Sequence, residues 1–272
     1  IQNKYYEIKG NIEQIDLEDI YSIIGKKYKI EGNIIRGQFR LENNNIDINK
    51  SPLLFSHILI NDGKLNEINF DSLFVSLTYH GRRLIISQYN LQTEFGSMKA
   101  DGWLNIDIFS DTLIFDLQDQ FDIFVTFDHF EIKNINKYIP WKYESKGLLT
   151  GSFEITGFVN NLEVLGKIEI ENPSIDNIEG DYLKGTISFQ NQRLYFNNLY
   201  LSTTKGVYTG FGNVPIPLNI IDTLNYKDLP IDFVFTGRSN SIEFIPAYFN
   251  AIDSLSGFNI IDSSFTMILE IA

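Results

Sequence analysis

The chain has no cysteine, only three histidines and no long apolar run. The absence of cysteine excludes disulfides, thiolate metal sites and cysteine nucleophiles, and it leaves the redox compartment open. No apolar stretch approaches the roughly 18 residues that a transmembrane helix needs. The chain begins at Ile1 with neither an initiator methionine nor a signal sequence, so we expect a part of a longer protein.

Basic residues are also scarce, since 22 Lys and Arg stand against 35 Asp and Glu and give a formal charge of −13. No Lys or Arg run is dense enough to neutralise a phosphate backbone, so the sequence predicts no nucleic-acid partner. The 272 residues are 43% apolar and 14% aromatic, which is enough to bury a core and argues against disorder.

The motifs of common catalytic sites are missing. His57, His80 and His129 are far apart and lack the spacing of a metal or base site, so we expect turn or surface histidines without a role. The segment 210–212 lacks the third glycine of a dinucleotide loop, and no G-x-S-x-G motif occurs. The sequence therefore predicts no enzyme and no cofactor.

An acidic cluster, Asp116, Asp119 and Asp122, is the one group that suggests a cation site. It lacks the D-x-D-x-D-G pattern of a calcium loop. We expect solvated linker acids here, and no metal.

The dominant pattern is alternation of apolar and polar residues, which is typical of β-strands with one buried face. The clearest examples are the segments 37–41, 151–155, 167–171 and 185–189. Asn61-Asp-Gly63 predicts a tight hairpin, and Asn172-Pro173 predicts a turn.

The sequence also repeats. Residues 58–106 align without a gap on residues 168–216 at an offset of 110, with 12 of 49 positions identical. Upstream, the apolar spacing of residues 17–24 recurs at 132–139 and again at 242–249, and predicts a helix of about two turns in each place. We expect repeat unit 1 over 1–115, unit 2 over 116–225 and the start of unit 3 over 226–272.

Such a unit has one strand, one short helix and about five further strands. The apolar face of the sheet can be covered by closure into a barrel, by a second sheet, or by curling into an open trough. Because a tandem repeat adds strands without limit, repetition favours the third. The predicted fold is all-β: an elongated, curled antiparallel sheet built from repeats of 110 residues, as an open trough or β-taco.

Alternation also predicts which residues face inward. Residues 98, 100, 102, 104 and 106 form the inward set of one strand, and residues 208, 210, 212, 214 and 216 form its counterpart. The full set that we expect to line the apolar face is Phe39, Leu41, Ile58, Ile60, Met98, Leu104, Phe153, Ile155, Ile168, Ile170, Ile187, Phe189, Tyr208 and Val214. The polar neighbours expected to face water are Glu154, Glu169, Glu171 and Ser188.

The order of these elements resembles the repeat of the TamB and AsmA-like family. In that family a strand leads to a short helix, then to a glycine-rich hairpin strand, then to a strand ending in an Asn or Gly turn. The matching segments are 121–127, 135–140, 147–157 and 162–172, followed by 183–185, 192–194, 199–201 and 206–212. The resemblance covers nearly the whole chain.

The resemblance implies a periplasmic protein of the Gram-negative envelope, anchored in the inner membrane, whose apolar groove carries phospholipid acyl chains towards the outer membrane. The inward set would then be the lipid-groove lining. The family's N-terminal anchor and C-terminal domain are missing here, so contact with an outer-membrane barrel partner would involve regions outside this sequence. The alternatives are a structural β-repeat stalk or adhesin, and an assembly factor for outer-membrane proteins.

Overall fold

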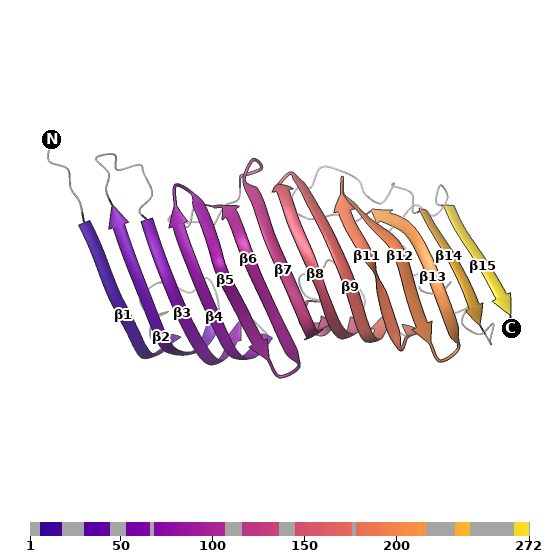
Figure 1. Ribbon diagram of the computed structural model, residues 1–272, viewed down its shortest axis with the longest axis horizontal. Helices are drawn as coiled ribbons and strands as arrows, with labels where there is room; N and C mark the ends of the chain where they lie inside the picture. Colours follow the sequence, from indigo (N-terminus) through magenta and orange to yellow (C-terminus); the bar gives the residue numbers. More distant parts are fainter. Residues whose placement is uncertain are drawn as a thin grey trace. The chain divides into compact units, whose positions relative to one another are not determined.

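The computed structural model describes residues 6–17, 30–43, 53–65, 68–106, 116–135, 145–175, 178–215, 232–239 and 264–271 (Figure 1). The chain divides into two compact units. The N-terminal unit holds residues 1–127 and 156–159, and the C-terminal unit holds residues 128–155 and 160–272.

The N-terminal unit is an antiparallel sheet in which the strand order follows the chain order (Figure 1). Its strands are β1 (Tyr6–Asp16), β2 (Ile30–Asn43), β3 (Leu53–Leu65), β4 (Ile68–His80), β5 (Arg83–Thr93) and β6 (Gly96–Asn105). The first residues of β7 (Gln120–Glu131) and the last residues of β8 (Ser145–Phe158) also belong to this unit.

The C-terminal unit holds the rest of β7 and β8 and a second run of strands. These are β9 (Asn161–Ile175), β10 (Ile178–Glu179), β11 (Tyr182–Gln190), β12 (Arg193–Thr203), β13 (Gly206–Pro215), β14 (Asp232–Ser239) and β15 (Ser264–Ile271). The strands from β9 to β14 pair antiparallel, β10 pairs only with β9, and β15 lies parallel to β14.

The prediction of an all-β, open antiparallel sheet is therefore confirmed, because the described strands of neither unit close into a barrel. Of the predicted helix over 132–139, the structure describes a single 3₁₀ turn, η1 (Ile132–Asn134), and Ile135 after it. The predicted helix over 242–249 and all but the first residue of that over 17–24 lie outside the described residues. The repeat boundaries stay a prediction.

The two turn predictions at asparagine are wrong. Strand β3 continues through Asn61-Asp-Gly63 and pairs with β4 on both sides of Asp62, whose φ is 48°. Strand β9 likewise continues through Asn172, whose φ is 49°. Asp and Asn tolerate a left-handed backbone, and ladder pairing with the neighbouring strand keeps the chain extended, so each residue forms an irregularity within a strand.

Two hairpins have the same register 110 residues apart. Arg83 of β5 pairs with Asn105 of β6, and Arg193 of β12 pairs with Pro215 of β13. In both hairpins the register shifts at the same place along the strands. The strand lengths are equal as well, with 11 residues in β5 and β12 and 10 in β6 and β13.

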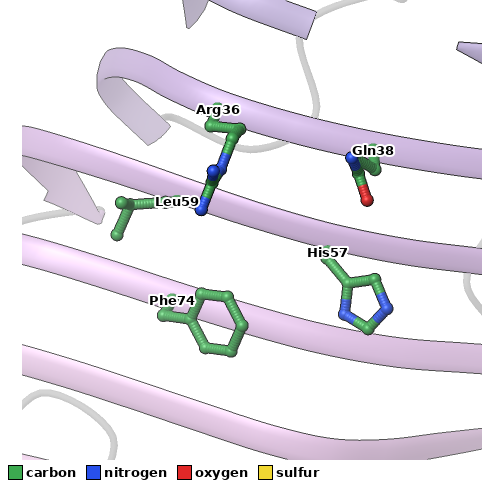
Figure 2. Close-up of a pocket in the computed structure, with 5 residues that line it drawn as sticks. All are labelled: Arg36, Gln38, His57, Leu59 and Phe74. Carbon is green, nitrogen blue, oxygen red and sulfur yellow. The ribbon is translucent and has the colours of Figure 1, made fainter. Parts of the chain in front are cut away.

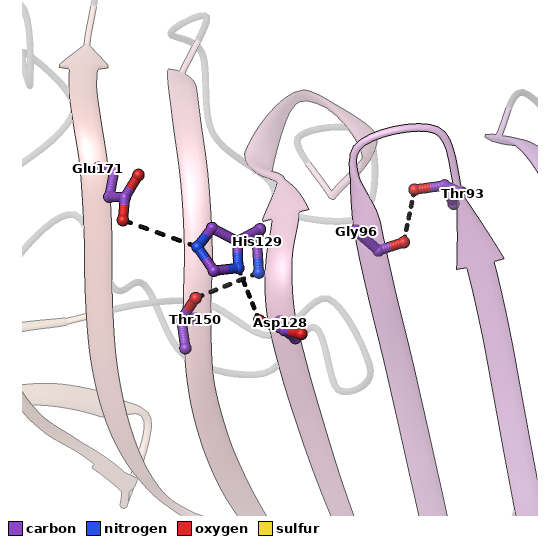
Figure 3. Close-up of polar contacts among 6 residues, drawn as sticks. All are labelled: Thr93, Gly96, Asp128, His129, Thr150 and Glu171. Atoms are coloured by element: carbon purple, nitrogen blue, oxygen red, sulfur yellow. Dashed lines mark hydrogen bonds and ion pairs between the residues drawn. The ribbon is translucent and has the colours of Figure 1, made fainter.

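The turns of these hairpins are fixed by the same threonine hydrogen bond. Thr93 Oγ1 donates to the carbonyl oxygen of Gly96 at 2.9 Å (Figure 3), and Thr203 Oγ1 donates to the carbonyl oxygen of Gly206 at 3.2 Å. Thr203 Oγ1 also accepts hydrogen bonds from the backbone N–H groups of Lys205 and Gly206. A side chain that satisfies turn backbone groups fixes where each hairpin reverses.

Candidate functional site

One face of the N-terminal unit is apolar across all of its complete strands. Residues that pair directly across an antiparallel ladder lie on the same face of the sheet. One cross-strand row is Ile8, Leu41, Leu54, Tyr79, Leu84 and Leu104, and another is Ile15, Ile34, Ile60, Leu73, Leu91 and Met98. The expected lining residues of this unit lie in these rows or on the same strands at positions of the same phase, as Phe39 and Ile58 do.

The C-terminal unit has an equivalent apolar face. Its rows are Ile170, Leu183, Leu201 and Tyr208; Gly166, Ile187, Phe196 and Gly212; and Val164, Phe189, Leu194 and Val214. The ring of Phe153 from β8 lies over Gly166 on this face. Ile155 and Ile168 follow by alternation along β8 and β9, so the expected lining residues of this unit also share one face.

These side chains are covered to different degrees. Ile60, Leu104, Phe189 and Tyr208 are buried, with 1–9% of their surface exposed. The other ten of the fourteen expected lining residues are neither buried nor fully exposed. Most of the expected lining therefore keeps some accessible apolar surface.

The opposite face of the C-terminal unit is polar. Glu154, Glu169 and Glu171 are exposed, as expected, and Ser188 is half-buried. Tyr182 donates its hydroxyl proton to Glu169 Oε2 at 2.8 Å. This hydrogen bond to Glu169 raises the pKa of Tyr182 above its ordinary value of 10.0, because ionisation would place a phenolate beside a carboxylate.

The polar face of the N-terminal unit carries a small ion-pair network at one end of β1 and β2. Lys9 Nζ and Arg40 Nε each lie 2.8 Å from Glu7 Oε1, and Arg40 also pairs with Glu42. The hydrogen bond from Lys9 holds the pKa of Glu7 below its ordinary value of 4.5. Two cations and two carboxylates therefore balance each other at this end.

The three histidines are exposed, as the sequence predicts. His129 has the most contacts (Figure 3): its Nδ1–H donates to Asp128 Oδ1 at 2.6 Å, and its Nε2 lies 3.7 Å from Glu171 Oε1. Its backbone N–H donates to Thr150 Oγ1 at 3.1 Å. These contacts join β7 to β8 and β9 at the surface, and within the described residues no nucleophile completes a catalytic set around this ring.

The acidic cluster differs from the expectation of solvated linker acids. Asp119 is buried, and its Oδ2 accepts a hydrogen bond from the backbone N–H of Asp116 at 2.7 Å. Arg82 Nη2 lies 3.5 Å from Asp119 Oδ1. The Asp119 backbone also bonds Asp116 and Val159, so this carboxylate holds a turn together. Within the described part of the chain, no three His, Asp or Glu side chains are arranged to hold a metal ion.

A hollow on the polar face of the N-terminal unit was not expected. It lies over β2, β3 and β4 and is lined by Arg36, Gln38, His57, Leu59 and Phe74 (Figure 2). Its only signal in the sequence is that Leu59 and Phe74 are apolar residues in the polar phase of their strands. Sequence alone does not give the register that brings the five side chains together.

The helices that the structure describes include none that is long and apolar enough to cross a bilayer. In comparisons with family models, curated proteins and solved structures, the chain matches none of them. The resemblance to the TamB and AsmA-like family stays a prediction.

Proposed function

We propose that this chain is a segment of a periplasmic bridge-like lipid transfer protein whose apolar face carries phospholipid acyl chains between the inner and outer membranes. The supporting observation is the pairing that collects the expected lining residues on one face of each unit while ten of the fourteen keep accessible surface. An apolar face that is accessible and continuous across a unit is suited to an apolar ligand.

The binding needs no reaction and little directional chemistry. Each methylene that leaves water contributes about 0.8 kcal/mol, so a chain of many methylenes binds through its length alone. We therefore expect tolerance of many acyl chains, no catalytic step and no cofactor.

The finer architecture belongs to the same proposal. The equal registers of the hairpins at 83–105 and 193–215 support repeat units of 110 residues, with boundaries near 115 and 225. Left-handed backbone conformations recur at the same offset, at Asp62 and Asn172 and at Arg82 and Gln192. We propose that such units form a curled open trough.

The experiment compares two neighbouring positions on β8. A photo-crosslinking side chain at Ile155 should capture phospholipid from the envelope, and the same side chain at Glu154 should not, because successive residues of a strand lie on opposite faces. Mass spectrometry of the crosslinked protein measures the adduct. Equal capture at both positions, or no capture at Ile155, would contradict acyl-chain binding.

A structural stalk is the second candidate, and one observation favours it. Tyr79, Leu91 and Tyr208 on the apolar faces are 0–1% exposed, so parts of these faces are fully packed. A stalk needs no accessible apolar surface. It predicts that no lipid copurifies with the chain and that Ile170→Arg mainly lowers the free energy of unfolding, whereas a conduit predicts that this change blocks lipid capture at Ile155.

A further inference from the structure

The hollow on the polar face of the N-terminal unit has no part in acyl-chain binding by the apolar face. Its volume is about 430 Å³, within the range of about 300–1,000 Å³ typical of small-molecule sites. Its walls come from three adjacent strands, and the side chains of Arg36, Gln38 and His57 are exposed at its rim while Leu59 and Phe74 are half-buried (Figure 2).

Strand register explains how the five residues meet. Arg36 pairs with Leu59, and Leu59 pairs with Phe74, so one row across β2, β3 and β4 holds a cation and two apolar side chains. Gln38 pairs with His57 in the adjacent row. Figure 2 shows the Arg36 side chain reaching across β3 towards Phe74. The guanidinium therefore lies beside an apolar wall, with an amide and an imidazole next to it.

The charge of Arg36 is available to a ligand. The neighbouring cations Lys9 and Arg40 are paired with carboxylates, but within the described residues Arg36 forms no ion pair. The nearest carboxylate by register is that of Glu13, opposite Arg36 on β1, and the two side chains do not form a salt bridge. A guanidinium left in this position presents several N–H donors in a planar fork that fits carboxylate or phosphate oxygens.

A second hollow at the equivalent register positions of the C-terminal unit has a different lining. It lies on β8, β9 and β11, with a volume of about 370 Å³, and includes Lys167, Glu169 and Lys184. These residues follow His57, Leu59 and Phe74 by 110 positions. The two apolar wall residues of the first hollow are thus replaced by charged ones, so a similar shape carries different chemistry.

We propose that the hollow around Arg36 binds an amphipathic anion, that is, a carboxylate or phosphate group attached to an apolar body. Arg36 would hold the anionic group with a charge-assisted, bidentate pair of hydrogen bonds, supported by polar contacts from Gln38 and His57. Leu59 and Phe74 would bury the adjoining apolar part. In a protein of formal charge −13, a hollow with an unpaired cation is a specific place for an anion. This site is independent of acyl-chain binding on the opposite face.

The test uses the full 272-residue chain and isothermal titration calorimetry with hexyl phosphate, which combines an anionic group and a short apolar chain. Arg36→Gln should weaken binding by at least about tenfold, because it removes a charge-assisted pair. Arg36→Lys keeps the charge without the planar fork and should weaken binding severalfold. Lys167→Gln removes the same charge from the second hollow and should leave the affinity unchanged.

Two further probes identify which part of the ligand is recognised. Hexanol, which has no charge, should not bind through Arg36, and inorganic phosphate should bind more weakly than hexyl phosphate. If inorganic phosphate bound as tightly, the apolar wall would contribute nothing and the assignment of an amphipathic ligand would be overturned. An affinity that is unaffected by Arg36→Gln, or is lowered equally by Lys167→Gln, would overturn the site itself. Neither result depends on whether Ile155 captures lipid.

Discussion

The ring of Phe153 lies over Gly166 so closely that a Cβ built on Gly166 would come within 2.6 Å of Phe153 Cδ1. Gly166→Ala therefore forces the ring to move within a packed row of the apolar face. Overpacking of this kind costs about 1–3 kcal/mol of the free energy of unfolding, which urea titration measures.

A matched control for this change is Gly37→Ala on the apolar face of the N-terminal unit. The nearest atom to a Cβ there is Ile12 Cβ at 3.4 Å, an ordinary contact, so the free energy of unfolding should change little. Combining Gly166→Ala with Phe153→Leu should restore part of the loss. Equal losses from the two single alanine changes would show that the ring contact is not the cause.

Gly102→Ala should be more damaging, because β7 blocks the space. Gly102 has a φ of +134°, and a Cβ there would overlap the carbonyl oxygen of Asp122. Backbone cannot give way as a side chain does, so we expect a loss of about 3 kcal/mol or more. Faster hydrogen exchange of the β6 and β7 amides would report the separation of these strands.

Gly81→Ala separates the clash from backbone strain. Gly81 also has a positive φ, +58°, but no atom lies within 4 Å of the position that a Cβ would take there. Only the left-handed conformation is penalised, by about 1–2 kcal/mol. If Gly81→Ala cost as much as Gly102→Ala, the contact with Asp122 would not be the decisive term.

Thr93→Val and Thr203→Val should each lower the free energy of unfolding by about 0.5–1.5 kcal/mol, since each removes a hydroxyl that bonds turn backbone. Thr204 is exposed in the turn between β12 and β13, so Thr204→Val serves as the control and should be close to neutral. Urea unfolding of the three variants provides the comparison. A neutral Thr203→Val would contradict the role assigned to that hydroxyl.

The hydrogen bond between Tyr182 and Glu169 predicts a pH dependence. Because the folded-state pKa of Tyr182 is raised, its contribution to stability is fully present below the ordinary value of 10.0 and is lost as the pH rises through the raised pKa. Glu169→Gln should lower the pKa of Tyr182, which NMR titration of the Tyr182 ring can follow. A pKa that stays raised in this variant would assign the shift to another cause.

Alternation made the assignment of faces predictable. A strand with one buried face must alternate, so Phe39 and Leu41, or Ile168 and Ile170, could be placed together from the sequence. Tertiary pairing was not predictable in the same way. Asn61-Asp-Gly63 has the composition of a hairpin turn, but hydrogen bonds to β4 on both sides keep it within β3.

The hollow around Arg36 escaped prediction for a related reason. Arg36, His57 and Phe74 lie on three strands, and only the register between those strands brings the side chains together. Asp119 was misjudged because its burial depends on turn geometry and on Arg82, which is distant in sequence. Local composition carries no information about either contact.

The equal lengths and registers of the hairpins at 83–105 and 193–215 make them exchangeable parts. A genetic crossover between the two segments would keep every ladder in phase, since Thr78 pairs with Ile85 as Ser188 pairs with Tyr195 on the preceding strand. Recombination within such a gene can therefore lengthen or shorten the protein by whole hairpins without passing through a misregistered intermediate.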